Sequence, residues 1–142
     1  MAEKPFYLLD THVWFWLVRG PEEGRLAAST GARLERAALG APLGVSVISV
    51  WEIALSASKG RIGLGMSVQE WIGLALDRPG FMMMELTPAI AIESCNLPGI
   101  FHADPADRFL VATARTRNAI LVTRDKRILS YGKQGHVRTL AA

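Results

Sequence analysis

Short apolar runs that end beside an acidic residue are the feature of this sequence that most constrains its fold. Residues 6–9 (Phe-Tyr-Leu-Leu) form one such run, which ends at Asp10, and residues 119–123 (Ala-Ile-Leu-Val-Thr) form another, which is followed by Asp125. Continuous apolar runs of this length are typical of strands that are buried on both faces of a parallel sheet. We therefore expect an α/β fold in which at least two central strands end beside a carboxylate.

Helical patterns alternate with further strand-like runs along the rest of the chain. Strands are predicted at residues 43–48, 81–86 and 136–140, and helices at residues 12–18, 25–38, 50–60, 67–77 and 88–97, with another helix after Asp104 and one short turn after Asp125. Ser49 is predicted to cap the helix from residue 50, with Glu52 as the second half of a capping box. This alternation predicts a three-layer α/β/α sandwich with a mostly parallel central sheet. The order of the strands cannot be predicted from the pattern.

Length and composition fit a single globular domain over residues 1–142. Half of the residues are hydrophobic and 20% are charged, close to the average for globular proteins. The longest stretch without a charged side chain, residues 37–51, is shorter than the ~18 to 20 apolar residues that span a membrane. The single cysteine agrees with a reducing compartment, so we expect a soluble cytoplasmic protein with no membrane partner. The net charge of +3 mildly favours a polyanionic partner such as nucleic acid.

Carboxylates lie in or beside apolar surroundings at four places in the sequence. They are Asp10, Glu52, the pair Asp104 and Asp107, and Asp125. Each alone could cap a helix. If they converge at the carboxyl edge of one sheet, however, they repel one another, and a hard cation such as Mg²⁺ or Mn²⁺ removes that repulsion. A cation held in this way activates water and neutralises charge on a phosphoryl oxygen, so the pattern predicts phosphodiester hydrolysis.

Four segments carry a family resemblance through their order and spacing. They are Leu8-Leu9-Asp10-Thr11-His12, Ser49-Val50-Trp51-Glu52, His102-Ala103-Asp104-Pro105-Ala106-Asp107-Arg108 and Leu121-Val122-Thr123-Arg124-Asp125. Over nearly the whole chain they resemble the PIN domain, and within it the VapC-type ribonuclease toxins of bacterial toxin-antitoxin modules. The resemblance implies an α/β/α sandwich and Mg²⁺-dependent cleavage of RNA, with Mn²⁺ able to replace Mg²⁺. It also implies that a metal-activated water attacks the phosphodiester in line.

The resemblance also assigns roles to the acidic residues. It implies that Asp10 and Asp107 are the main metal-binding acids, that Glu52 is the third, and that Asp125 is the fourth and often acts through water. Together these four residues form the expected catalytic site. Asp104 matches the first aspartate of the family's Asp-Pro-x-Asp-Arg segment, and we assign it to capping the following helix.

Substrate contacts are expected from residues near the acidic edge. Arg108, which adjoins an expected ligand, and Arg124 are predicted to contact RNA, and the further basic candidates are Lys59, Arg61, Lys126 and Arg127. Thr123 resembles the hydroxyl residue that helps to position ligands in this family. His12 is expected to hydrogen-bond locally at a helix start, and His102 has no partner at the spacing of a metal site.

Partners and alternatives follow from the same comparison. Relatives are silenced by a small antitoxin whose C-terminal segment occupies a groove near the acids, and they usually form homodimers. Apolar helices with Trp14, Trp16 and Leu17 are the candidate dimer face. One alternative is a catalytically silent PIN-like module that binds RNA or protein. A phosphatase of the haloacid-dehalogenase type is disfavoured, because the second aspartate of that class falls where this chain has His12.

Overall fold

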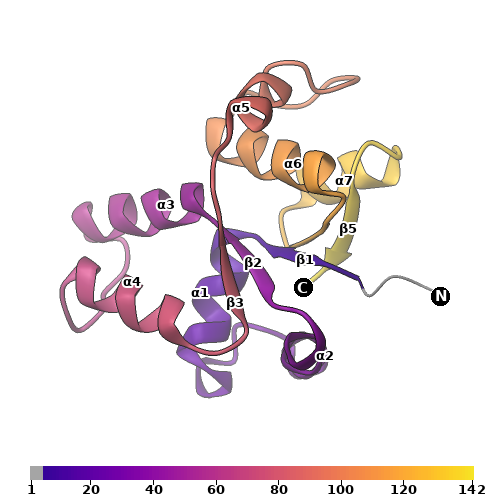
Figure 1. The fold of residues 1–142 in the computed structure, drawn as a ribbon. Coiled ribbons are helices and arrows are strands. Elements are labelled where there is room, and N and C mark those ends of the chain that lie inside the picture. The colour runs from indigo at the N-terminus through magenta and orange to yellow at the C-terminus, as the bar shows by residue number, and fades with distance from the viewer. Residues whose placement is uncertain (1–4) are drawn as a thin grey trace.

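Five parallel strands form the centre of the fold (Figure 1). The computed structural model describes residues 5–142. The strands are β1 (Tyr7–Leu9), β2 (Leu43–Ser46), β3 (Phe81–Met84), β4 (Ile120–Thr123) and β5 (Arg138–Ala141), in the spatial order β3-β2-β1-β4-β5. Each neighbouring pair runs parallel. The chain therefore builds the sheet outward from β1 in two directions, and ligands of open α/β sheets bind where the strand order reverses.

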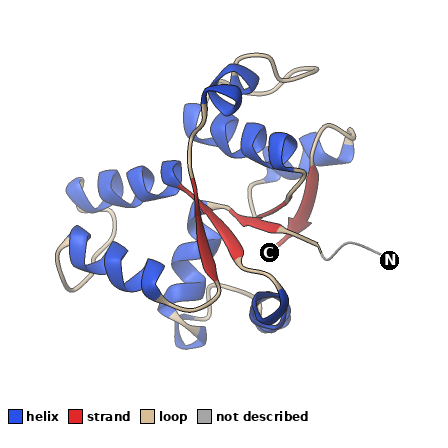
Figure 2. Ribbon diagram, in the orientation of Figure 1, coloured by secondary structure: helices blue, strands red, loops and turns tan. Residues whose placement is uncertain are grey.

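Helices cover both faces of this sheet (Figure 2). They are α1 (Thr11–Arg19), α2 (Ala28–Gly40), α3 (Val47–Ser58), α4 (Val68–Asp77), α5 (Pro88–Ser94), α6 (Pro105–Arg117) and α7 (Lys126–Lys133), with a 3-10 turn at Pro21–Glu23. Helices α1, α2 and α4 pack on one face, α6 and α7 pack on the other, and α5 lies against α6. This confirms the predicted three-layer sandwich. No helix within residues 5–142 is long and apolar enough to cross a membrane.

The central strand β1 supplies both hydrophobic cores. Leu9 belongs to the core under α1, α2 and α4, whereas Leu8 belongs to the core under α6 and α7. Neither side chain is exposed to solvent. Successive residues of a strand point to opposite faces, so an unbroken apolar run is the pattern expected of a strand that is covered on both sides.

Several predicted element boundaries differ from the structure, and two of the differences lie beside the acidic residues. Strand β2 ends at Ser46, and Ser46 rather than Ser49 caps α3, because its Oγ accepts a hydrogen bond from the backbone N–H of Ile48 at 3.1 Å. Glu52 is therefore not part of a capping box. After Asp125 the chain forms the eight-residue helix α7 instead of one turn, since Ile128 and Tyr131 are both buried in the core.

The burial of β1 gives a stability prediction. Leu9→Ala should lower the free energy of unfolding by about 2 to 5 kcal/mol, because it leaves a cavity in a close-packed core. Leu39→Ala is the matched control, because that side chain is 89% exposed, and its effect should stay within about 0.5 kcal/mol. Urea unfolding followed by circular dichroism measures both values. Equal effects of the two substitutions would contradict the described core.

Candidate metal and catalytic site

The acidic residues lie where the central strands end. Asp10 directly follows β1, and Asp125 comes two residues after Thr123, the last residue of β4. Because β1 and β4 are parallel neighbours, both acids lie at the same edge of the sheet. Glu52 comes from α3, and Asp107 from the first turn of α6. Four elements that are distant in the sequence thus each bring one carboxylate to this edge.

Two threonines connect three of these acidic residues. The Thr123 hydroxyl donates to Oδ2 of Asp10 at 2.6 Å and accepts a hydrogen bond from the backbone N–H of Asp125 at 3.0 Å. The Thr11 backbone N–H donates to Oδ1 of Asp10 at 2.7 Å, and its hydroxyl donates to Oε1 of Glu52 at 2.5 Å. Both threonines are buried. Buried hydrogen bonds of this kind restrict the orientation of the carboxylates before any ligand binds.

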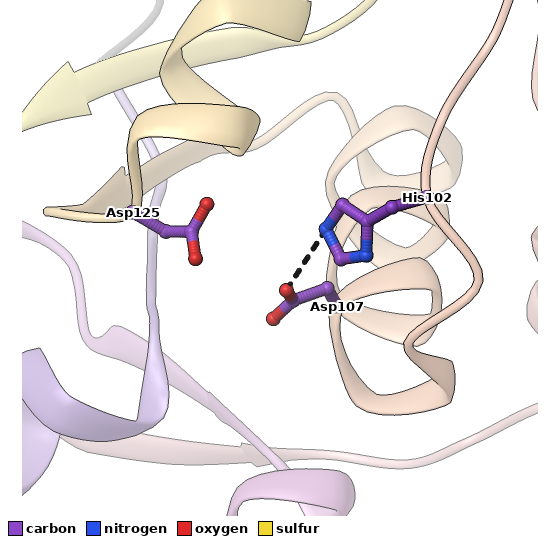
Figure 3. Close-up of side chains that lie close together, drawn as sticks. All are labelled: His102, Asp107 and Asp125. Carbon is purple, nitrogen blue, oxygen red and sulfur yellow. Dashed lines mark ion pairs between the residues drawn. The ribbon is translucent and has the colours of Figure 1, made fainter.

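Asp107 faces His102 and Asp125 (Figure 3). The His102 Nε2 atom lies 3.1 Å from Oδ2 of Asp107, at the distance but not the angle of a hydrogen bond. The Nδ1 atom of His102 accepts a hydrogen bond from the backbone N–H of Asp104, so in a neutral ring the proton is on Nε2, toward Asp107. One ligand atom from each of His102, Asp107 and Asp125 lies within 4.8 Å of the others.

The expectation that His102 has no partner was therefore wrong. His102 lies in the loop between α5 and α6, where no helical or strand periodicity relates it to Asp107. The only signal in the sequence was its place at the start of the segment His102-Ala103-Asp104-Pro105-Ala106-Asp107-Arg108. Asp104 caps α6 as expected, because its Oδ1 accepts a hydrogen bond from the Asp107 backbone N–H at 3.3 Å.

The electrostatics of this edge favour cation binding. Burial, followed by repulsion from the neighbouring carboxylates, raises the pKa of Asp107 to about 7. The neighbouring acids are Asp10, Asp104, Asp125 and Glu52. Burial also raises the pKa of Asp10 and of Glu52 above their usual values. Each of these shifts means that the folded chain resists full ionisation of its acids, and a divalent cation removes that resistance.

Asp125 differs from the other acids. Burial acts to raise its pKa, but the backbone N–H groups of Ile128 and Arg127 and the Arg127 guanidinium outweigh burial and hold the pKa below its usual value. The Arg127 Nη2 atom lies 3.6 Å from Oδ2 of Asp125 and 3.7 Å from Oδ2 of Asp107. Asp125 thus offers an ionised carboxylate as a possible metal ligand at the exposed side of the cluster. The set of carboxylate oxygens fits a hard cation such as Mg²⁺ or Mn²⁺.

The model of the PIN domain family matches residues 7–134 of the chain. This protein belongs to the PIN domain family. Over 124 residues it is 36% identical to Ribonuclease VapC22 of Mycobacterium tuberculosis. This match covers 87% of this chain and 90% of that protein.

Solved structures share the fold of this PIN domain. VapBC2 from Rickettsia felis, bound to a DNA fragment from its promoter, aligns with a TM-score of 0.72 at 17% identity, over 96% of this chain and 98% of that chain. DNA-bound VapBC from Salmonella typhimurium aligns with a TM-score of 0.69 at 14% identity over the same shares. At these identities the structures show that the fold is common to all three proteins.

Two arginines of this PIN domain that were expected to bind substrate also make contacts within the fold. Arg108 donates to the backbone carbonyl groups of Ser94, Phe101 and His102 at 2.8 to 3.1 Å, and so fixes the loop that carries His102. The exposed Arg124 guanidinium stacks 4.6 Å above the centre of the Trp16 ring. Their contact with RNA stays a prediction, whereas the structural role of Arg108 was not foreseen.

Two of the three residues expected at a dimer face on α1, Trp14 and Leu17, are buried in the core, whereas Trp16 is only partly buried. Trp14 is completely buried and its ring lies against that of Trp71 at 5.5 Å, and Leu17 is 7% exposed. Both residues belong to the core beneath α1 and α4. His12 is exposed and packs against Trp16, with 5.7 Å between the ring centroids, which agrees with a local role.

The raised pKa of Asp107 predicts how stability depends on pH. Between its usual value of 3.8 and about 7, the folded protein keeps a proton that the unfolded chain loses, so this residue lowers stability as the pH rises. Asp107→Asn should therefore stabilise the metal-free protein, and its advantage should grow by about 1 to 3 kcal/mol from about pH 5 to about pH 7.5. Thermal unfolding in EDTA at several pH values measures this difference.

The control for this prediction is Asp77→Asn, since Asp77 is an exposed acid at the end of α4. Its effect should not grow with pH in this way. Added Mg²⁺ should raise the melting temperature of the unaltered protein and of the control, but not that of Asp107→Asn. Parallel pH profiles of Asp107→Asn and the unaltered protein would contradict the raised pKa.

The contact between Thr11 and Glu52 gives a second prediction about the site. Thr11→Val removes the hydroxyl that donates to Glu52, so Mn²⁺ affinity should fall by roughly 10-fold or more, as for other residues that orient a metal ligand. Thr11→Ser keeps the hydroxyl and should keep most of the affinity. Electron paramagnetic resonance of free Mn²⁺ measures both. Tight Mn²⁺ binding by Thr11→Val would show that Glu52 does not need this donor.

Proposed function

We propose that this protein is a divalent-metal-dependent endoribonuclease and the toxin of a toxin-antitoxin module. The observation that carries the proposal is the convergence of four carboxylates at the β1–β4 edge, where burial and then repulsion from the neighbouring acids raise the pKa of Asp107 to about 7. A chain that keeps this unfavourable arrangement needs a cation there, and hydrolysis of phosphodiesters is the chemistry that such a site supplies. The name of the relative, Ribonuclease VapC22, supports RNA as the substrate.

Asp10, Glu52, Asp107 and Asp125 would hold Mg²⁺ or Mn²⁺. When bound, the ion would supply a nucleophilic water and offset the charge that develops on the phosphate. The chain itself orients the acids: Thr123 holds Asp10 and the backbone of Asp125, and Thr11 holds Glu52. Arg127 carries a positive charge at the exposed border of the cluster, where it can meet the phosphate of an incoming RNA.

The partners belong to the same proposal. Structures with this fold include VapBC from Salmonella typhimurium and a toxin-antitoxin complex from Klebsiella pneumoniae, which supports a cognate antitoxin for this chain. We propose that an antitoxin covers the acidic edge, that the protein forms a homodimer, and that it works in the cytoplasm, where cellular RNA is available. Trp14 and Leu17 cannot form the dimer face, because they are buried in the core.

Cleavage of a mixed RNA pool tests the proposed activity. Protein freed of any co-purified antitoxin should cleave RNA in Mg²⁺ or Mn²⁺ but not in EDTA. Asp10→Asn and Asp107→Asn should each reduce the rate by more than ~100-fold, because the ion stabilises the transition state by several kcal/mol. The control is Asp77→Asn, since Asp77 is an exposed acid that is distant in sequence from the site. This variant should cleave RNA as fast as the unaltered protein does.

Two results would contradict the proposal. Cleavage that survives both site substitutions would come from a contaminant or from another site. An antitoxin-free protein that neither cleaves RNA nor binds Mn²⁺ would be the catalytically silent module considered above.

A further inference from the structure

A pocket of about 310 Å³ adjoins the acidic cluster. It lies between the loop before α6 and the exposed side of α7, and His102 and Arg127 belong to its lining. These two residues also contact Asp107, so the pocket lies directly beside the carboxylates. Nothing in the proposed metal chemistry uses the rest of this pocket.

The wall formed by α7 carries three polar side chains in register. Lys126, Ser130 and Gln134 are spaced four residues apart, so they lie on one face of the helix, and all three are exposed and line the pocket. They offer a positive charge, a hydroxyl and an amide in a row. The charge suits a phosphate, whereas the hydroxyl and amide can both donate to and accept from the edge of a base.

The opposite wall is apolar, and packing and a hydrogen bond hold Phe101 within it. Ile100, which is 92% exposed, and Phe101 line this side of the pocket. The Phe101 ring packs on Tyr131 at 4.7 Å between centroids, and the Phe101 carbonyl accepts a hydrogen bond from Arg108. The pocket is therefore formed before a ligand arrives, with an apolar surface facing a row of hydrogen-bonding groups. Most small-ligand sites in proteins combine these two features.

We propose that this pocket binds one unpaired nucleotide of the RNA, next to the phosphate that is cleaved, and thereby sets the sequence preference of the enzyme. The base lies against Ile100 and is recognised by Ser130 and Gln134, while Lys126 binds a backbone phosphate. The inference rests on the ribonuclease function proposed above. The volume of the pocket is at the small end of the range for ligand pockets, which suits a single nucleotide. Proteins recognise RNA sequence mostly on unpaired bases in this way.

Single substitutions on the pocket side of α7 test the inference. We would compare Lys126→Gln, Ser130→Ala and Gln134→Ala with the control Lys133→Gln, which changes an exposed lysine of the same helix outside the pocket. The substrate is single-stranded RNA that the unaltered protein cleaves, together with a randomised RNA pool whose cleaved ends are sequenced. Mn²⁺ affinity and melting temperature are measured for each variant.

Lys126→Gln should raise KM by about fivefold or more, with kcat and Mn²⁺ affinity within about twofold of the unaltered protein. Ser130→Ala and Gln134→Ala should change the base preferred at one position beside the cut. Lys133→Gln should change neither property. Because all four side chains are exposed, the melting temperatures should stay the same.

Failure of the inference and failure of the proposed function give different results. If the pocket variants keep the KM and base preference of Lys133→Gln while Asp107→Asn abolishes cleavage, the nucleotide pocket is wrong and the ribonuclease function stands. If the unaltered protein neither cleaves RNA nor binds Mn²⁺, the function is wrong and the pocket inference fails with it.

Discussion

The crowding of four carboxylates, of which Asp10 is buried and the other three are partly buried, is the constraint on which the rest of this structure depends. The parallel pairing of β1 with β4 brings Asp10 and Asp125 to one edge, and α3 and α6 add Glu52 and Asp107. Burying one acid is already unfavourable, and each neighbouring acid increases the cost. The fold tolerates the arrangement because the acids accept hydrogen bonds from threonine hydroxyls and backbone N–H groups, and because Arg127 lies at the border.

The two aspartates at the start of α6 have different roles. Asp104 caps the helix, so its carboxylate satisfies the backbone N–H of Asp107. Asp107 is therefore free of a capping role, and its own carboxylate faces the cluster instead. Arg108, the next residue, ties down the preceding loop through three carbonyl groups and so holds His102 against Asp107. One short stretch of sequence thus supplies the cap, the acid and the support of its neighbour.

Much of the fold could be predicted because its signals are local. The apolar run of β1 follows from burial on both faces, and the N-cap of α6 follows from Asp104 and the proline after it. Asp10 and Asp125 could be placed at one edge because each follows a strand end, whereas Glu52 and Asp107 were assigned to the site by the family resemblance. The strand order could not be predicted, since it depends on packing between distant segments. The role of His102 and the backbone contacts of Arg108 were missed for the same reason: both lie in or against an irregular loop, where spacing carries no information.

The hydroxyl of Thr123 makes the stability of the sheet depend on the register between β1 and β4. In the observed register Leu9 lies opposite Val122, so the next residues along, Asp10 and Thr123, meet at the strand ends. A shift of β4 by one residue would turn Thr123 to the opposite face and leave Asp10 without its hydroxyl donor in a buried setting. A misaligned chain would thus lose stability at the same residues that we propose to bind the cation. Correct pairing of the central strands and correct placement of the acidic site thus depend on the same hydrogen bond between Thr123 and Asp10.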